Sequence, residues 1–104
     1  MSVIAIDNKT YAEAINQSGK VIVKVSSPTC GPCKMMTPLF EKISKEVEDV
    51  QFCAFEVTSD DDQVLARSLN VSSVPAFLIY ENNVLTNQFA GAFPGAILKT
   101  KLGI

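Results

Sequence analysis

The sequence predicts an α/β domain in which a mixed five-stranded sheet is flanked by four helices, in the order β-α-β-α-β-α-β-β-α. Short apolar runs rich in β-branched residues, such as 21–25 and 76–80, alternate along the chain with amphipathic stretches. The 104 residues are 47% hydrophobic and 19% charged, which suffices for one buried core. We therefore expect residues 1–104 to form a single domain.

The first half of the chain supplies two strands and two helices. Residues 3–6 are a short strand, and Asp7 or Thr10 caps the next helix, with Thr10 and Glu13 matching a capping box. Residues 21–25 are almost all apolar, as expected of a strand covered on both faces. A long amphipathic helix then carries apolar residues at helical spacing: Met36, Leu39, Phe40, Ile43 and Val47.

The second half begins with a strand at residues 50–57. Ser59 then caps a helix whose first turn carries three acids at residues 60–62, where the helix dipole favours negative charge. The apolar residues expected on its inner face are Val64, Leu65 and Leu69.

The chain ends in a predicted hairpin and a short helix. The strand at residues 76–80 and an antiparallel partner at 84–90 are joined by Asn82 and Asn83, which tolerate positive φ. Pro94 suits the start of the last helix. The residues expected to pack from that helix are Ala96, Ile97 and Leu98.

Composition excludes several classes of function. The net charge is −2 and the nine basic residues are scattered, so no nucleic-acid surface is expected. No apolar run approaches the roughly 20 residues of a membrane span. The first residues lack a basic start and a long apolar run, so we expect a cytoplasmic protein without a secretory signal, and a monomer.

The chain has three cysteines and no histidine. The absence of histidine removes imidazole ligands, imidazole bases and Cys/His catalysis. Zinc needs three or four protein ligands, and the one cysteine outside the close pair, Cys53, lies in a predicted strand. We expect no metal and no bound cofactor, and we expect Cys53 to be a small buried core residue.

Cys30 and Cys33 lie between a predicted strand and a predicted helix. A thiol in the first turn of a helix is stabilised as a thiolate by the positive helix end and by free N–H groups. Since the thiolate is the nucleophile, this placement makes Cys30 reactive. The second thiol lies within reach, so the pair is predicted to cycle between dithiol and disulfide.

The run from Cys30 to Lys34, with sequence CGPCK, resembles the active-site motif of the thioredoxin family. Further marks of that family occur in order over nearly the whole chain. Pro38 resembles its helix-kinking proline, and Asp60 an acid at the start of its third helix. Val74-Pro75 resembles its cis-proline dipeptide, and Gly91 its glycine near the end of the last strand.

The resemblance implies a division of roles. Cys30 is the exposed nucleophile and Cys33 the buried resolving thiol, and the substrate-binding positions lie around them. Gly31 allows close approach of a substrate backbone, and Pro32 stiffens the loop and favours a reducing pair. The backbone of Val74 pairs with the substrate peptide beside Pro75. The positions matched to this surface are Thr29, Gly31, Pro32, Val74, Pro75 and Gly91.

The sequence also departs from the family pattern. Thr29 and Ser26 stand where the family usually has aromatic residues, so the surface around Cys30 is expected to be less apolar. Lys24 stands where the family usually has a buried acid, and Glu56 where it usually has a lysine.

Neighbouring parallel strands could bring Lys24 and Glu56 into contact beneath the active site. We expect Glu56 to accept the proton of the resolving thiol, directly or through water, while Lys24 offsets its charge. The alternative is that Lys24 extends its amine to solvent and Glu56 is a surface acid.

The resemblance therefore implies a protein disulfide reductase acting through Cys30 and Cys33. Its partners would be oxidised proteins and, as electron source, an NADPH-linked thioredoxin reductase. One alternative is a specialised electron donor, for example to a ribonucleotide reductase, or a glutaredoxin-like protein, although the Gly-Pro spacer disfavours the latter. Another is a binding subunit that uses the fold without turnover.

Overall fold

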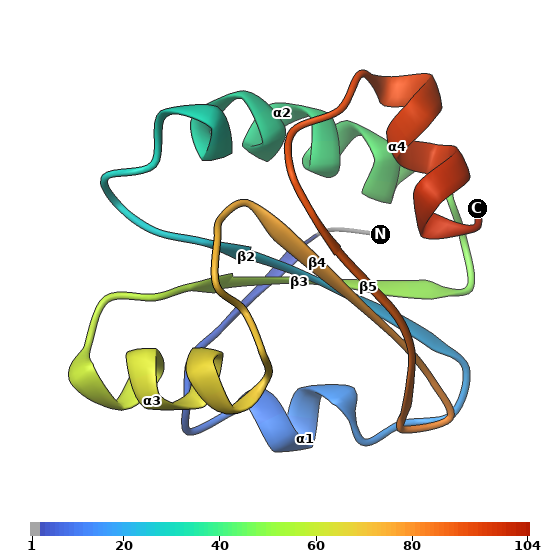
Figure 1. The fold of residues 1–104 in the computed structure, drawn as a ribbon. Coiled ribbons are helices and arrows are strands. Elements are labelled where there is room, and N and C mark those ends of the chain that lie inside the picture. The colour runs from blue at the N-terminus through green and yellow to red at the C-terminus, as the bar shows by residue number, and fades with distance from the viewer. Residues whose placement is uncertain (1–2) are drawn as a thin grey trace.

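The computed structural model describes residues 3–104, which form one five-stranded sheet with helices on both faces (Figure 1). The strands are β1 (Val3–Ile6), β2 (Lys20–Ser26), β3 (Val50–Glu56), β4 (Ala76–Glu81) and β5 (Val84–Ala90). The helices are α1 (Tyr11–Ile15), α2 (Gly31–Glu46), α3 (Asp60–Ser68) and α4 (Gly95–Leu102). The predicted element order is confirmed.

The sheet is mixed, with the strand order β1-β3-β2-β4-β5. β3 runs parallel to β1 and β2, whereas β4 is antiparallel to β2 and β5 is antiparallel to β4. The turn between β4 and β5 has positive φ at both Asn82 and Asn83, as predicted. β2 is central, and four of its apolar side chains are completely buried: Val21, Ile22, Val23 and Val25.

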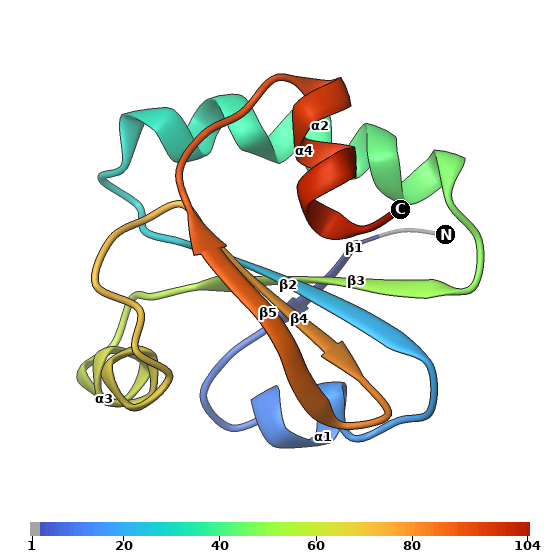
Figure 2. The same cartoon turned by 45° about the vertical axis from the view of Figure 1, so that its right-hand side comes forward.

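Alternation along the strands divides the core into two layers. α2 and α4 cover one face of the sheet, and α1 and α3 cover the other, as the two views show (Figures 1 and 2). Under α2 and α4, the layer includes Ile22, Phe40, Phe52, Phe77 and Leu98. Under α1 and α3, it includes Tyr11, Val23, Val25, Phe55 and Leu78. Lys24 shares the strand face of Ile22 and therefore lies under α2.

Helix capping agrees with the sequence at α3, whereas before α1 the structure contains the Asp7 alternative and lacks the Thr10–Glu13 capping box. Ser59 and Asp62 form a capping box at the start of α3. The predicted capping box of Thr10 with Glu13 is wrong, because the Thr10 side chain makes no cap hydrogen bond. Its hydroxyl instead pairs with Asp7, whose carboxylate accepts the backbone N–H groups of Lys9 and Thr10.

Two predicted inner faces are partly wrong. Val64 on α3 is 58% exposed, because that helix turns Asp62 and Ala66 toward the sheet, with Leu65 and Leu69 flanking them. On α4, Ala96 and Ile97 are exposed, and the buried residues are Leu98 and Leu102, one turn apart. In both helices the apolar residues do not all lie on one face, and packing against the sheet determines which of them are buried.

Candidate active site

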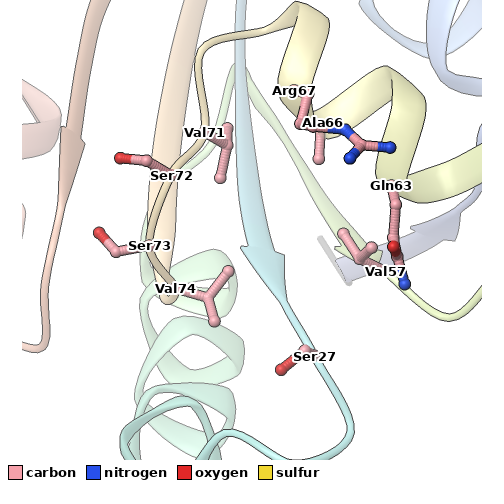
Figure 3. Close-up of a pocket in the computed structure, with 9 residues that line it drawn as sticks. All are labelled: Ser27, Val57, Gln63, Ala66, Arg67, Val71, Ser72, Ser73 and Val74. Atoms are coloured by element: carbon pink, nitrogen blue, oxygen red, sulfur yellow. The ribbon is translucent and has the colours of Figure 1, made fainter.

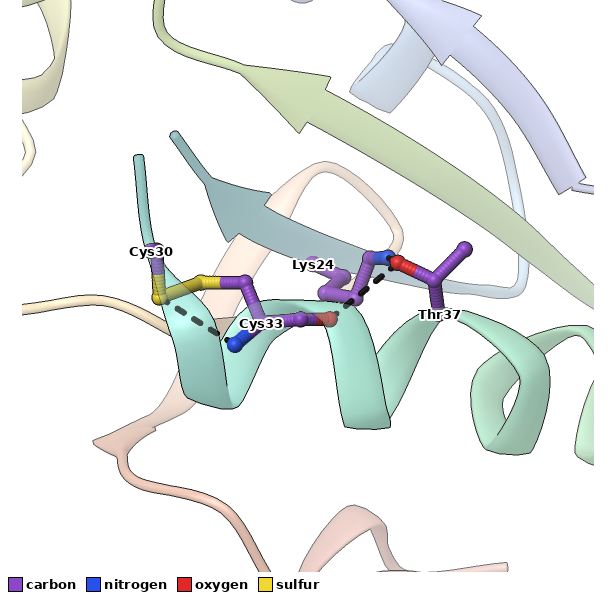
Figure 4. Close-up of a disulfide and its surroundings, with 4 residues drawn as sticks. All are labelled: Lys24, Cys30, Cys33 and Thr37. Carbon is purple, nitrogen blue, oxygen red and sulfur yellow. Dashed lines mark hydrogen bonds between the residues drawn. A yellow bond between two sulfur atoms is a disulfide. The ribbon is translucent and has the colours of Figure 1, made fainter. Parts of the chain in front are cut away.

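A disulfide joins Cys30 and Cys33 at the start of α2 (Figure 4). Cys30 is the N-cap residue, and the Cα atoms of the two cysteines are 5.3 Å apart. The backbone N–H of Cys33 donates to the sulfur of Cys30 over 3.1 Å. In the reduced protein, this N–H and the positive end of the helix stabilise a Cys30 thiolate. The predicted redox pair is therefore in place.

The two cysteines differ less in exposure than the resemblance implied. Cys30 is 9% exposed and Cys33 is 3% exposed. Cys30 is the more accessible of the two, but it is not a freely exposed side chain. The neighbouring residues Thr29, Gly31 and Pro32 are exposed, so a partner can approach the sulfur across them. A Cβ added at Gly31 would meet no atom within 4 Å, which shows that this side of the loop is open.

The loop before β4 forms a second part of the site. The Val74–Pro75 peptide bond is cis, as the resemblance implied. The Pro75 carbonyl accepts the N–H of Gly91 over 2.8 Å, which ties this loop to the end of β5. Gly91 has φ of +124°, and a Cβ there would lie 3.1 Å from the ring of Phe93. Glycine is required at this position for both reasons.

A pocket of about 240 Å³ adjoins the disulfide loop (Figure 3). Ser27 from the loop before Cys30 and Val74 from the loop before β4 both line it, so the two loops share one hollow. α3 contributes Gln63 and Arg67 with their polar groups at the rim. The other lining residues are Val57, Ala66, Val71, Ser72 and Ser73.

Lys24 lies in the middle of β2 beneath α2 and is 3% exposed. Its Nζ donates to the Thr37 hydroxyl over 2.9 Å, and that hydroxyl donates to the carbonyl of Cys33 over 3.1 Å (Figure 4). Nζ also lies 5.7 Å from the centre of the Phe40 ring. Burial lowers the pKa of Lys24 below its usual 10.5, although the negative charges of Glu41 and Glu56 oppose this shift.

The expected contact between Lys24 and Glu56 is wrong. Within residues 3–104, no ion pair joins Lys24 to an acidic side chain, and Glu56 is exposed. Lys24 pairs with Ala54, so Glu56 lies two residues further along β3, opposite Ser26. The Lys24 amine extends to Thr37 on α2 instead, and the Glu56 side chain is exposed. The alternative in which Lys24 extends to solvent is also wrong.

Thr37 is the member of the site that the sequence analysis missed. It lies four residues after Cys33, so both occupy one side of α2. That spacing, together with a lysine in the strand beneath, was the available signal. Threonine is common on exposed helix positions, so the spacing alone does not single it out.

Cys53 lies outside this site, in the core layer under α1 and α3. It is 1% exposed, and burial raises the pKa of its thiol to about 11. The thiol is therefore protonated and unreactive at neutral pH, which confirms its predicted core role.

Within the part of the chain that the structure describes, no cluster of His, Cys, Asp or Glu could hold a metal ion. Over the same residues, no helix is long and apolar enough to cross a membrane.

A disulfide at the start of a helix, on a mixed sheet beside a cis-proline loop, defines a dithiol–disulfide oxidoreductase. The family model described as Thioredoxin matches residues 2–103. The chain belongs to the thioredoxin family, and its fold is the thioredoxin fold.

Individual relatives agree with this assignment. A thioredoxin from Equus caballus is 36% identical over 90 residues, which cover 84% of each chain. Thioredoxin domain-containing protein 2 from Mus musculus is 34% identical over 93 residues, and the match covers 88% of this chain but 18% of that protein. The crystal structure of thioredoxin f from spinach chloroplast superimposes with a TM-score of 0.87 at 26% identity, covering 98% of this chain and 92% of the other.

Proposed function

We propose that this chain reduces disulfide bonds in client proteins, with Cys30 as the attacking sulfur and Cys33 as the resolving sulfur. The observation that carries the assignment is the position of Cys30. It is the N-cap of α2, its sulfur accepts the N–H of Cys33, and it is the more accessible cysteine. Helix N-termini lower the pKa of a thiol, so Cys30 has the environment of the nucleophile.

The reaction proceeds by two thiol–disulfide exchanges. The Cys30 thiolate attacks a sulfur of the client disulfide, forming a mixed disulfide, and the other client sulfur leaves as a thiolate. The Cys33 thiolate then attacks the Cys30 sulfur, and the second client sulfur leaves. The client gains two electrons and takes up two protons from solvent, while the Cys30–Cys33 disulfide forms.

The pocket that Ser27 and Val74 line gives this reaction a place for the client chain. A segment that lies across Pro75, with its backbone against Val74, can place an adjacent apolar side chain between Val57 and Val71. Arg67 at the rim makes no ion pair within residues 3–104, so its guanidinium is available to an acidic client residue. We propose that Thr29, Gly31, Pro32 and Gly91 complete the client surface.

The dithiol must be regenerated by an external donor, and we propose an NADPH-linked thioredoxin reductase for this step. We also propose that the protein works in the cytoplasm, in electron transport and in maintaining cell redox balance. A reducing compartment suits a chain whose third cysteine, Cys53, is a free thiol. We propose that the protein acts as a monomer.

A specialised electron donor is the second candidate, and two departures from the family pattern favour it. The exposed Thr29 replaces an aromatic residue usual in the family, so the client surface around Cys30 differs, and Lys24 replaces a buried acid beneath the site. The other polar replacement, Ser26, is buried and lies outside that surface. Turnover of insulin with thioredoxin reductase supports the general reductase. Turnover confined to one acceptor, such as a ribonucleotide reductase, supports the specialised donor. Reduction by glutathione alone supports a glutaredoxin-like protein.

Glu56 as the proton acceptor for Cys33 stays a proposal. Its carboxylate is exposed and forms no ion pair with Lys24 within residues 3–104, and we propose that water relays the proton to it. The test is the rate at which the mixed disulfide resolves in Glu56→Gln, measured from pH 5 to 9. An unchanged pH profile would remove Glu56 from the mechanism.

Trapping from a lysate tests the reductase function itself. Cys33→Ser is expected to accumulate mixed disulfides through Cys30, which dithiothreitol releases. The matched control is Cys30→Ser, which leaves the less accessible sulfur and should trap far less. If neither variant traps a protein and the Cys30→Ser/Cys33→Ser double variant keeps full biological activity, the chain is a binding subunit instead.

A further inference from the structure

Lys24 is a buried amine without an acidic partner. It is 3% exposed in the central strand, and no carboxylate within residues 3–104 lies at ion-pair distance. A cation placed there weakens folding unless another group compensates for its lost hydration. In this structure the compensating groups are the Thr37 hydroxyl and the face of the Phe40 ring. A buried lysine with this little support points to a function for its charge.

The amine lies directly below the redox helix. Nζ binds the Thr37 hydroxyl, and the same hydroxyl binds the backbone carbonyl of Cys33. Cys33 and Thr37 are one helical turn apart on α2, about 5.4 Å along the axis. The Lys24 charge is therefore held within about one turn of the resolving cysteine, in a region where Cys33 is 3% exposed. Charges at such a separation interact much more strongly in a protein interior than in water.

The charged groups around Lys24 are few. Glu41 on α2 and Glu56 on β3 both favour its protonated form, and neither is in contact with it. Its neighbour across the antiparallel pair with β4 is Phe77, which carries no charge. When the disulfide is reduced, Cys33 adds a second group on α2, besides Glu41, that can place a negative charge near Lys24.

We propose that Lys24 is the counter-charge of the Cys33 thiolate, so that reduction of the disulfide and protonation of Lys24 are coupled. This proposal rests on the proposed function, in which Cys33 is the resolving sulfur. Lys24 acts through its charge and is a positioning residue for the second exchange. It keeps Cys33 ionised at the moment when Cys33 must attack the mixed disulfide.

Reduction of the disulfide consumes a dithiol reductant. Two electrons pass to the Cys30–Cys33 disulfide, its S–S bond breaks, and the reductant forms its own disulfide and gives up two protons. One proton is retained by Cys30 or released to solvent, and the other is held by Lys24 opposite the Cys33 thiolate. In the forward reaction this thiolate attacks the Cys30 sulfur of the mixed disulfide. The Cys30–Cys33 bond forms as the bond from Cys30 to the client breaks, and the departing client thiolate takes a proton from water.

Coupling is reciprocal, so it has two measurable consequences. A Cys33 thiolate raises the pKa of Lys24 in the reduced protein relative to the oxidised protein. Equally, the Lys24 charge lowers the pKa of the Cys33 thiol and makes the disulfide easier to reduce. Removing the charge should therefore make the pair more strongly reducing.

Lys24→Met tests the proposal, because methionine nearly matches the length of the lysine stem and carries no charge. We expect the pKa of the Cys33 thiol, followed by thiolate absorbance in Cys30→Ser backgrounds, to rise by at least one unit. Equilibration with dithiothreitol buffers at pH 8 should favour the protein disulfide at least tenfold more than in the parent. This change corresponds to a reduction potential about 30 mV more negative. Lys24→Arg should retain the parent pKa and potential. Lys42→Met is the control and should leave both unchanged, since Lys42 is an exposed lysine on α2, the helix that carries the cysteines.

An unchanged thiol pKa and an unchanged potential in Lys24→Met would overturn the proposal. If the disulfide still forms reversibly in Lys24→Met, the proposed reductase function stands even when this proposal fails. If the parent protein itself never formed the Cys30–Cys33 disulfide in solution, both would be refuted. If Lys24→Met does not fold, the parent protein supplies the test. The pKa of Lys24, measured by NMR of a labelled lysine side chain, should be higher in the reduced than in the oxidised protein, and equal values would overturn the proposal.

Discussion

The Nζ of Lys24 donates to the hydroxyl of Thr37 over 2.9 Å, which joins the central strand of the sheet to the helix that carries the disulfide. The hydroxyl is at the same time a donor to the carbonyl of Cys33. One threonine thus holds a buried cation and the backbone of the resolving cysteine in a fixed relationship.

Thr37→Val removes that hydroxyl at almost constant volume. We expect the oxidised protein to lose about 1–2 kcal/mol of unfolding free energy, because a buried ammonium loses its hydrogen-bond acceptor. The reduction potential should shift in the same direction as in Lys24→Met. Denaturant unfolding and equilibration with dithiothreitol measure the two effects. Thr37→Ser is the control and should behave like the parent, while a fully stable Thr37→Val would contradict this role.

Lys24→Met should stabilise the oxidised protein near neutral pH by about 1–3 kcal/mol, since a buried charge without an ion pair is replaced by an apolar chain. Burial lowers the pKa of Lys24 in the folded protein below its usual 10.5. The unfolded chain therefore binds more protons between the two pKa values, and parent stability rises with pH across that window. The extra unfolding free energy of Lys24→Met over the parent should be largest below the pKa of Lys24 in the folded protein. It should disappear above about pH 10.5, the usual pKa of lysine. Urea unfolding at several pH values tests this expectation, and parallel pH curves for the two proteins would contradict it.

Ser73→Trp should block the pocket beside the disulfide loop. Ser73 is exposed and lines the pocket, so an indole there can occupy the hollow without entering the core. We expect KM for a protein disulfide to rise several-fold, whereas reduction of a small aromatic disulfide should stay unchanged. Gln17→Trp, at an exposed position away from this pocket, is a suitable control for a surface indole. Equal effects of Ser73→Trp on both substrates would exclude the pocket from client binding.

Asp62 is a buried carboxylate that joins the loop after β1 to the start of α3. It accepts hydrogen bonds from Asn8, Thr58 and Ser59. Burial raises its pKa, but the hydrogen bonds outweigh burial and hold the pKa well below its usual range. The stability contributed by this group is therefore complete above about pH 4 and is lost as the pH falls further.

Asp62→Asn should lower the unfolding free energy at pH 7 by about 2 kcal/mol, because an amide cannot accept all of these hydrogen bonds. The variant should also lose less stability than the parent between pH 4 and pH 2. Chemical denaturation at both ends of that range is the measurement. Asp61→Asn, on the exposed side of the same turn, is the matched control. A parent and variant with equal acid sensitivity would show that Asp62 is not the titrating group.

The hydroxyl groups of Tyr11 and Tyr80 lie 2.7 Å apart between α1 and the sheet, and both residues are buried. Tyr11→Phe or Tyr80→Phe should each cost about 1–2 kcal/mol, because the remaining hydroxyl loses its partner. The double variant should cost less than the sum of the two single variants. Thermal unfolding of the four proteins measures this coupling, and additive losses would contradict it. The reduction potential should stay constant, since the pair lies on the other face of the sheet from Lys24.

The sequence by itself determined the element order, the redox pair and the hairpin. These features depend on local properties: apolar periodicity along the strands, the cysteines at a helix start, and two asparagines that accept positive φ. The resemblance carried the cis Val74–Pro75 bond, which the structure contains.

Tertiary structure alone decided which partners Lys24 has. The sequence pattern suggested Glu56, but that carboxylate is exposed, and the packing of α2 over β2 places the Thr37 hydroxyl at the amine instead. Packing of α3 and α4 on the sheet also left Val64 and Ile97 exposed, although both are apolar. A side chain's type and spacing limit the faces it can occupy, whereas the packing of whole elements fixes which atoms come within bonding distance.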